Sequence, residues 1–195
     1  LIADYLAGQG NIVNHNQLAI SSMRVEELRV LLDNTYNGDE YTEWRFTAGQ
    51  NWFNNALPGG LDALREDYQT KIADADLVTI DIGANNFGVF LSRYIMSGVD
   101  NSISVSDISP EIGEKYAIAK EYILGLLAEQ GVSVGADIEE IVELLTYALV
   151  GYCYNFDVVM EKIYALNPDV DVVVVSIQNL MEGKNIKVPG SEETI

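Results

Sequence analysis

The stretch DLVTIDIGANNFG, residues 76–88, decides the fold that the sequence predicts. Its apolar part, residues 77–82, is short and rich in β-branched side chains, which favours a buried strand over a helix. Gly83 ends this run, and Asn85 and Asn86 follow closely. A buried strand that runs into a glycine and then into polar side chains is typical of parallel sheets, where ligands bind at the carboxyl ends of the strands.

Helical patterns surround this strand on both sides. Residues 25–33 and 61–73 carry apolar residues at helical spacing before it, and two longer helical patterns follow it. The β-branched run in VDVVVVSIQN, residues 170–179, predicts a second strand that is parallel to the first and buried on both faces. A short extended segment is also expected at residues 18–20. This alternation of helix and strand predicts an α/β fold with a parallel sheet covered on both faces.

The two later helices have predicted starts and packing faces. The first is expected to begin with Ser109 as N-cap and Pro110 as its first residue. The second is expected to run from Asp137 to Asn167, with Glu140 placed for a capping-box-like start. Apolar residues at helical spacing more often pack than bind a ligand. The expected packing positions are Ile112, Tyr116, Ala119, Ile123 and Leu126 in the first helix, and Ile138, Ile141, Leu145, Leu149, Tyr152, Phe156, Val159, Ile163 and Leu166 in the second.

The net charge of the chain limits the classes of partner that it can bind. The 195 residues carry 30 acidic and 11 basic side chains, for a formal charge of −19. Binding to nucleic acid or to an anionic membrane relies on Lys and Arg, so the charge argues against both partners. No apolar run approaches the ~20 residues of a membrane-spanning helix, so no transmembrane segment is expected. Length and apolar content predict a single domain over residues 1–195, and the oligomeric state stays open.

Cys153 and His15 are the only residues of their types in the chain. Cys153 lies in a helical pattern and is predicted to be a buried structural residue. His15 lies in a polar stretch and is predicted to be a surface or structural residue. With no second Cys or His, a typical zinc site is not expected.

Two roles are open for Asn85 and Asn86. An asparagine held at a strand end can donate an uncharged N–H to an oxygen that becomes negative as an acyl group is attacked, and backbone N–H groups can join it. Alternatively, the two side chains cap a helix that begins at Phe87. The ends of the other predicted strands, residues 21–22 and 176–179, are expected at the same sheet edge.

The segment DLVTIDIGANNFG resembles the third conserved block of the SGNH hydrolases, the GDSL esterase and lipase family, in which Gly-x-Asn-Asp follows a buried strand. Other segments are similar to that family in the same order along the chain: LIADYLAG (residues 1–8), NQLAISSMRVEEL (16–28) and NPDVDVVVVSIQN (167–179). The resemblance implies a three-layer α/β/α sandwich with a mainly parallel sheet and no cofactor. It also implies hydrolysis of an acyl ester in a small-molecule, lipid or acylated-glycan substrate.

The resemblance assigns roles to four residues. Asn85 matches the side chain that donates to the oxyanion, and Ser22 matches the position whose backbone N–H donates, where the family has Gly. Gly83 and Asn86 match the supporting residues of the third block, with Asn86 in place of the family's Asp. Ser22 keeps the N–H but adds a side chain close to the substrate, and Asn86 removes a charge from a position that mostly braces the site.

The family's nucleophile and acid/base motifs, Gly-Asp-Ser and Asp-x-x-His, do not occur within residues 1–195. They are expected upstream and downstream of these residues. A nucleophilic Ser21 or Ser22 with His15 as base is disfavoured, because His15 lies too near along the same extended run. On this interpretation the chain lacks the family's first strand, is inactive by itself, and is aggregation-prone or only partly folded.

Further hypotheses concern the remaining regions. Part of residues 98–136 is predicted to form a helical cap that shapes the acyl pocket. The alternative to an enzyme is a non-catalytic module of the same fold that binds a glycan or an acylated ligand through the cleft at the strand ends, with the loop of Trp44 and Trp52 as a platform. A nucleotide binder is disfavoured, because no predicted strand leads into a glycine-rich phosphate loop.

The composition also bears on localisation. Acidity, one cysteine and many Tyr and Asn residues favour an exported bacterial protein.

Overall fold

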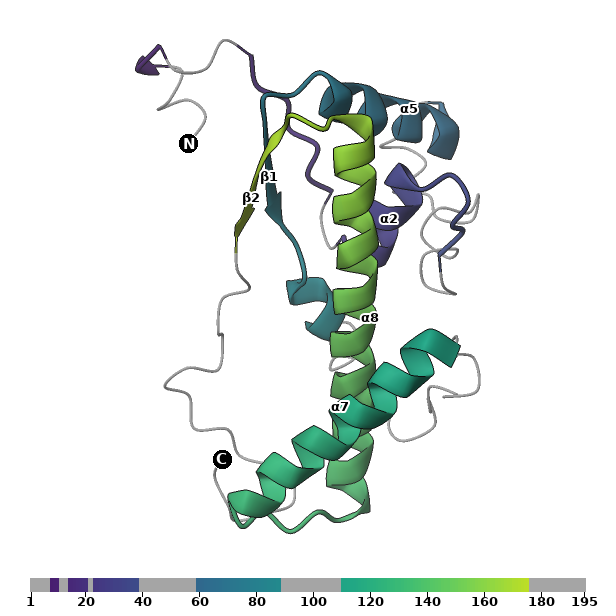
Figure 1. Ribbon diagram of the computed structural model, residues 1–195, viewed down its shortest axis with the longest axis vertical. Coiled ribbons are helices and arrows are strands. Elements are labelled where there is room, and N and C mark those ends of the chain that lie inside the picture. Colours follow the sequence, from purple (N-terminus) through teal and green to yellow (C-terminus); the bar gives the residue numbers. More distant parts are fainter. Residues whose placement is uncertain (1–7, 11–13, 21–22, 39–58, 89–109, 176–195) are drawn as a thin grey trace.

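The structure, a computed structural model, describes residues 8–10, 14–20, 23–38, 59–88 and 110–175. Its helices and strands are α2 (Val25–Leu32), α5 (Gly60–Ala73), β1 (Leu77–Asp81), α7 (Pro110–Glu129), α8 (Ala136–Leu166) and β2 (Asp171–Val175). The described part is mostly helical with a small parallel sheet, which is compatible with the predicted α/β class (Figure 1). The three-layer sandwich stays a prediction.

β1 and β2 pair in parallel, with Leu77 opposite Asp171 and Asp81 opposite Val175. In the sequence, α7 and α8 lie between the two strands, as a parallel pairing requires. The predicted parallel pairing of these two segments is therefore confirmed.

The prediction that β2 is buried on both faces is wrong. Val173, Val174 and Val175 are 50%, 44% and 46% exposed. The hydrophobic core includes Val170, just before β2, and reaches Val172 within it, and it extends no farther along β2 among the described residues. A run of valines therefore predicted the strand correctly, but it did not show which of its side chains the helices would cover.

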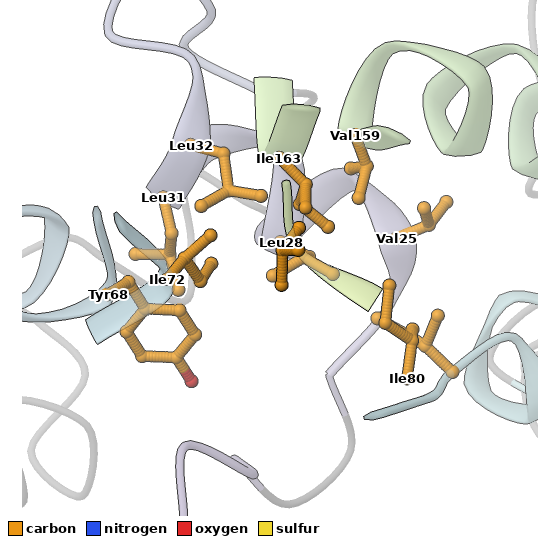
Figure 2. Packing of buried hydrophobic residues seen from close by; sticks show 11 residues of the cluster. Val25, Leu28, Leu31, Leu32, Tyr68, Ile72, Ile80, Val159 and Ile163 are labelled. Carbon is orange, nitrogen blue, oxygen red and sulfur yellow. The ribbon is translucent and has the colours of Figure 1, made fainter. Parts of the chain in front are cut away.

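The short helix α2 lies at the centre of the hydrophobic core. Its residues Val25 and Leu31 are fully buried, and they share one cluster with residues of α5, α8 and the sheet (Figure 2). The cluster consists of Val25, Leu28, Leu31, Leu32, Tyr68, Ile72, Ile80, Ile82, Val159, Ile163 and Val170. A helix of eight residues is unstable in water by itself, so tertiary contacts must hold α2 in place.

The long helix α8 packs against two groups of elements. Its carboxyl-terminal half contributes Val159 and Ile163 to the core around α2. Its amino-terminal half packs against α7, which crosses it in the lower part of Figure 1, and Lys120 of α7 forms ion pairs with Glu139 and Glu143. α8 thus joins α7 to the rest of the described fold.

The predicted packing stripe of α8 is right from Tyr152 to Leu166, but it is wrong at Leu145 and Leu149 in the first half. Leu145 and Leu149 are 36% and 39% exposed, whereas Val142 and Thr146 are buried. The buried side of α8 changes along its length because its two halves pack against different neighbours. On α7, Tyr116 is buried as predicted, but Leu126 is 43% exposed.

Asn167 joins the ends of two helices. It follows α8, and its side-chain Nδ2 lies 3.2 Å, 3.1 Å and 2.8 Å from the carbonyl oxygens of Ile72, Ala73 and Ala75. The last carbonyl groups of a helix have no partner within that helix. Asn167 therefore supplies donors to the carboxyl end of α5, immediately before β1.

The helix starts agree only in part with the sequence. α7 begins at Pro110, as predicted, whereas Ser109 lies outside the described residues. α8 begins at Ala136, and its N-cap Gly135 forms no side-chain capping bond, so the capping-box prediction with Glu140 is wrong. None of the described helices combines the length and the apolar character needed to cross a membrane.

Three other predictions concern single segments. Residues 18–20 have no regular secondary structure, so the predicted strand is absent from that segment. His15 is exposed, in agreement with a surface residue. Cys153 is exposed on α8, so the prediction of a buried cysteine is wrong. Consecutive residues of an α-helix point in directions about 100° apart. Tyr152 packs against the core, so the next residue, Cys153, points away from it.

Candidate functional site

The chain turns sharply where β1 ends. Gly83 is buried and has φ = 125°, a backbone conformation that residues with a side chain rarely adopt. Residues 84–88 are helical, and the backbone N–H of Asn86 donates to the Gly83 carbonyl at 2.9 Å. Both asparagines therefore lie inside this helical turn, and the prediction that they cap a helix starting at Phe87 is wrong.

Asn86 instead caps α2. Its side chain is fully buried, and its Oδ1 accepts a hydrogen bond from the backbone N–H of Val25 at 3.0 Å. Its Nδ2 donates to the Glu26 carboxylate at 2.7 Å. The first N–H groups of a helix have no partner within that helix, so Asn86 satisfies one of them from another part of the chain.

Asn85 contacts the segment that leads into α2. Its side chain is half-buried, and its Nδ2 donates to the carbonyl oxygen of Met23 at 3.1 Å. An amide nitrogen carries two hydrogens, and Met23 is the partner of Asn85 among the described residues. Met23 directly follows Ser22, the expected backbone donor, which lies outside the described residues.

Arg24 and Glu27 fix the start of α2 from within the helix. The Glu27 carboxylate accepts from the backbone N–H of Arg24 at 2.6 Å and from its guanidinium at 3.1 Å and 2.8 Å. Both side chains are buried. Charged residues are seldom buried unless they are paired, and here each satisfies the other.

Glu26 connects this region to α8. Its buried carboxylate accepts from Asn86 and, at 3.4 Å, from Asn155 of α8. Asn155 also donates to the Gly151 carbonyl at 2.8 Å and accepts from Arg29 at 2.9 Å. Because Glu26 lies in the first turn of α2, the positive end of the helix dipole favours its negative charge.

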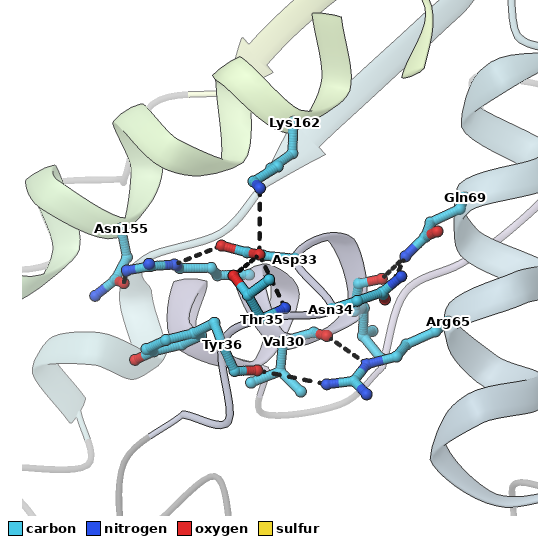
Figure 3. A network of polar contacts seen from close by, with 11 residues as sticks. Val30, Asp33, Asn34, Thr35, Tyr36, Arg65, Gln69, Asn155 and Lys162 are labelled. Atoms are coloured by element: carbon cyan, nitrogen blue, oxygen red, sulfur yellow. Dashed lines mark hydrogen bonds and ion pairs between the residues drawn. The ribbon is translucent and has the colours of Figure 1, made fainter. Parts of the chain in front are cut away.

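The carboxyl end of α2 is held by α5. Arg65 donates to the Val30 carbonyl at 2.8 Å, and Gln69 donates to the Leu31 carbonyl at 2.9 Å (Figure 3). These carbonyl groups lie in the last turn of α2, where intrahelical partners are missing. Both ends of α2 are thus capped by side chains from distant parts of the chain.

Asp33 ends α2 in a network of donors. It accepts from the backbone N–H and the hydroxyl of Thr35 at 3.1 Å and 2.7 Å, and the ammonium of Lys162 lies 3.2 Å away (Figure 3). Burial by itself would raise the pKa of Asp33, but the bonds from Thr35 and Lys162 outweigh burial and hold the pKa below 3.8. The carboxylate is therefore charged at neutral pH.

Three of the four predicted site residues, Gly83, Asn85 and Asn86, lie in one turn after β1, and the side chains of Asn85 and Asn86 bond to the start of α2. The sequence did not predict that Glu26 would join them. The chain matches no protein-family model, no curated protein and no solved structure.

The described residues offer a hydrogen-bonding site. Among them, no group of His, Cys, Asp or Glu side chains could hold a metal ion. The turn after β1 presents two amides, Asn85 and Asn86, and the buried carboxylate of Glu26 is bound to Asn86. An uncharged donor at a strand end can stabilise a developing negative charge.

Proposed function

We propose that the chain carries the oxyanion-hole part of an acyl-ester hydrolase of the SGNH type. In this proposal Asn85 donates its side-chain N–H, and Ser22 its backbone N–H, to the oxygen that becomes negative when the ester is attacked. Gly83 and Asn86 support the position of Asn85. The substrate is an ester of a small molecule, a lipid or an acylated glycan, and no cofactor takes part.

One observation carries this proposal: the half-buried amide of Asn85, at the end of a parallel strand, is tied to the residue next to Ser22. A catalytic donor must be held in place before the reaction, because orienting it during the reaction costs free energy. Within the part of the chain that the structure describes, the bond from Asn85 to Met23 uses one amide hydrogen, and the second one can donate to a substrate. Partial exposure leaves the amide accessible to a bound acyl group.

The reaction also needs a serine nucleophile and an acid/base pair, which residues 1–195 do not contain in the family's motifs. The test therefore uses the complete natural open reading frame that includes these residues. Hydrolysis of p-nitrophenyl acetate and butyrate is measured for the parent, for Asn85→Ala and for Asn34→Ala. Asn34 is an exposed asparagine at the opposite end of α2 and serves as the matched control.

Loss of one oxyanion donor should lower kcat by about 10²-fold or more. Asn85→Ala is expected to show this loss, and Asn34→Ala is expected to keep the parental rate. A parent without esterase activity would contradict the proposal and favour a binding module instead. A parent that is active but insensitive to Asn85→Ala would exclude Asn85 as the donor.

A further inference from the structure

Asn86 is the most constrained polar side chain at the end of β1. It is fully buried, and both ends of its amide are bonded to consecutive residues of α2. Its oxygen must face the Val25 N–H, which can only donate, and its nitrogen must face the Glu26 carboxylate, which accepts when ionised. The two partners therefore permit one orientation of the amide.

The same contacts decide where Asn85 lies. Asn85 precedes Asn86 in the same helical turn, and its partner Met23 lies two residues before Val25. The Asn86 bonds thus hold the backbone of residues 84–88 against the start of α2. From this position the Asn85 amide donates to the Met23 carbonyl.

We infer that Glu26 and Asn86 form one positioning unit that orients Asn85. The kinetic part of this inference rests on the proposed function, whereas its structural part does not. Neither residue touches the reacting atoms; both act through Asn85 and through the segment at residues 23–25. The unit requires an amide donor on one of the two residues and a carboxylate acceptor on the other.

The bond between Glu26 and Asn86 explains why position 86 carries Asn, whereas the conserved block that this segment resembles has Asp. An aspartate in place of Asn86 would put a second carboxylate in hydrogen-bonding distance of the Glu26 carboxylate, in a buried site where like charges repel strongly. The amide of Asn86 avoids this repulsion and donates instead. Exchanging the donor and the acceptor between the two positions should preserve the contact.

The test is a set of three variants of the complete natural protein. Asn86→Asp removes the amide donor and brings a second carboxylate next to that of Glu26. The double variant Glu26→Gln/Asn86→Asp restores a donor, now on residue 26, while the carboxylate introduced at position 86 can still accept from the Val25 N–H. Asn167→Asp is the control, because it makes the same chemical change at another amide that bonds to several groups, beside Ala75 before β1, whereas Asn85 follows β1.

Two readouts are taken on each variant. The first is hydrogen exchange of the Asn85 side-chain amide, followed by NMR, with the exposed amide of Asn34 as reference. The second is the separate measurement of kcat and KM for p-nitrophenyl acetate. A misplaced catalytic group lowers kcat, by up to about 10²-fold for a shift of 1 Å, whereas a loss of substrate contacts would raise KM.

We expect Asn86→Asp to speed amide exchange at Asn85 and to lower kcat with little change in KM. The double variant should recover both properties, and Asn167→Asp should lower stability without changing either one. If Asn86→Asp does not fold, the double variant decides: a folded, protected double variant supports the unit, and an unfolded one overturns it.

Other outcomes are equally decisive. Unchanged exchange at Asn85 in Asn86→Asp, or a double variant as impaired as the single one, would overturn the inference. An Asn167→Asp variant that reproduces both effects would do the same, because general destabilisation would then explain them. An inactive parent would refute the proposed function, and the exchange measurements would still decide whether Glu26 and Asn86 orient Asn85.

Discussion

The ammonium of Lys162 lies 3.2 Å from the carboxylate of Asp33, so a side chain of α8 meets the residue that ends α2. Thr35 adds two hydrogen bonds to the same carboxylate. Asp33 is buried, and these donors favour its charged form over the protonated form. This contact is one of several that hold the short central helix from outside.

The Asp33 contact should make stability depend on pH in the acid range. The pKa of Asp33 is lower in the folded protein than its ordinary value of 3.8. Its contribution is therefore complete above pH 3.8 and is lost as the pH falls through the folded pKa. Asp33→Asn should lower the free energy of unfolding by about 1–3 kcal/mol at pH 7. Urea unfolding should show this difference shrinking as the pH falls below 3.8; a difference independent of pH would contradict the assignment.

Tyr68 should resist ionisation. Its hydroxyl donates to the Leu18 carbonyl, and burial, with a smaller effect from Asp67, raises its pKa to about 12. The contribution of Tyr68 to stability is complete below the ordinary pKa of 10.0 and is lost as the pH rises through about 12. An alkaline absorbance titration of the protein, minus that of Tyr68→Phe, should show one step near pH 12. A step near pH 10.0 would show that the hydroxyl is not buried in solution.

Thr146 should be replaceable by valine. Its hydroxyl oxygen is fully buried and has no hydrogen-bond partner in the part of the chain that the structure describes. Burying an unpaired hydroxyl costs about 1–3 kcal/mol, and valine has nearly the same shape. Thr146→Val should therefore leave the free energy of unfolding unchanged or raise it, whereas Thr146→Ser should lower it by creating a small cavity. Clear destabilisation by valine would reveal a partner for the hydroxyl.

Asn167 should stabilise the fold, although it lies in the connection between α8 and β2. Its amide serves three carbonyl groups at and beyond the end of α5, and its own oxygen accepts from the Asp169 N–H at 3.2 Å. Asn167→Ala should lower the free energy of unfolding by about 1–3 kcal/mol, because the carbonyl groups lose their donor. Chemical denaturation of this variant beside Asn34→Ala checks the expectation. Equal stability of the two variants would mean that water replaces the amide without cost.

The sequence predicted the elements better than it predicted their burial. The strand at residues 77–81, the turn at Gly83 and the parallel partner at residues 171–175 follow local rules for hydrophobic runs and glycine. The exposure of Val174 and Leu145 does not, because it depends on which neighbour covers each side. Hydrophobic periodicity and composition describe one segment of the chain at a time, whereas the burial of a side chain depends on which other segment packs against it.

The candidate site shows the same division. The sequence singled out Asn85 and Asn86, since polar residues at a strand end are conspicuous, but it did not show their partners. Glu26 and Glu27 belong to VEELRVLL, where acidic residues in the first turn fit an exposed helix start equally well. Their burial follows from an Arg three residues away and from an Asn sixty residues away. A contact across sixty residues leaves no local pattern.

The divided packing of α8 has a consequence for how the protein opens. At 1.5 Å per residue its 31 residues extend over about 46 Å, and the hydrophobic core around α2 occupies only its carboxyl-terminal part. The contact between α7 and the amino-terminal part of α8 can therefore open while the hydrophobic core around α2 stays intact. Such partial openings need less free energy than global unfolding, so amide protons of α7 should exchange with solvent much faster than those of α2. The two regions would then behave as separate cooperative units that share one helix.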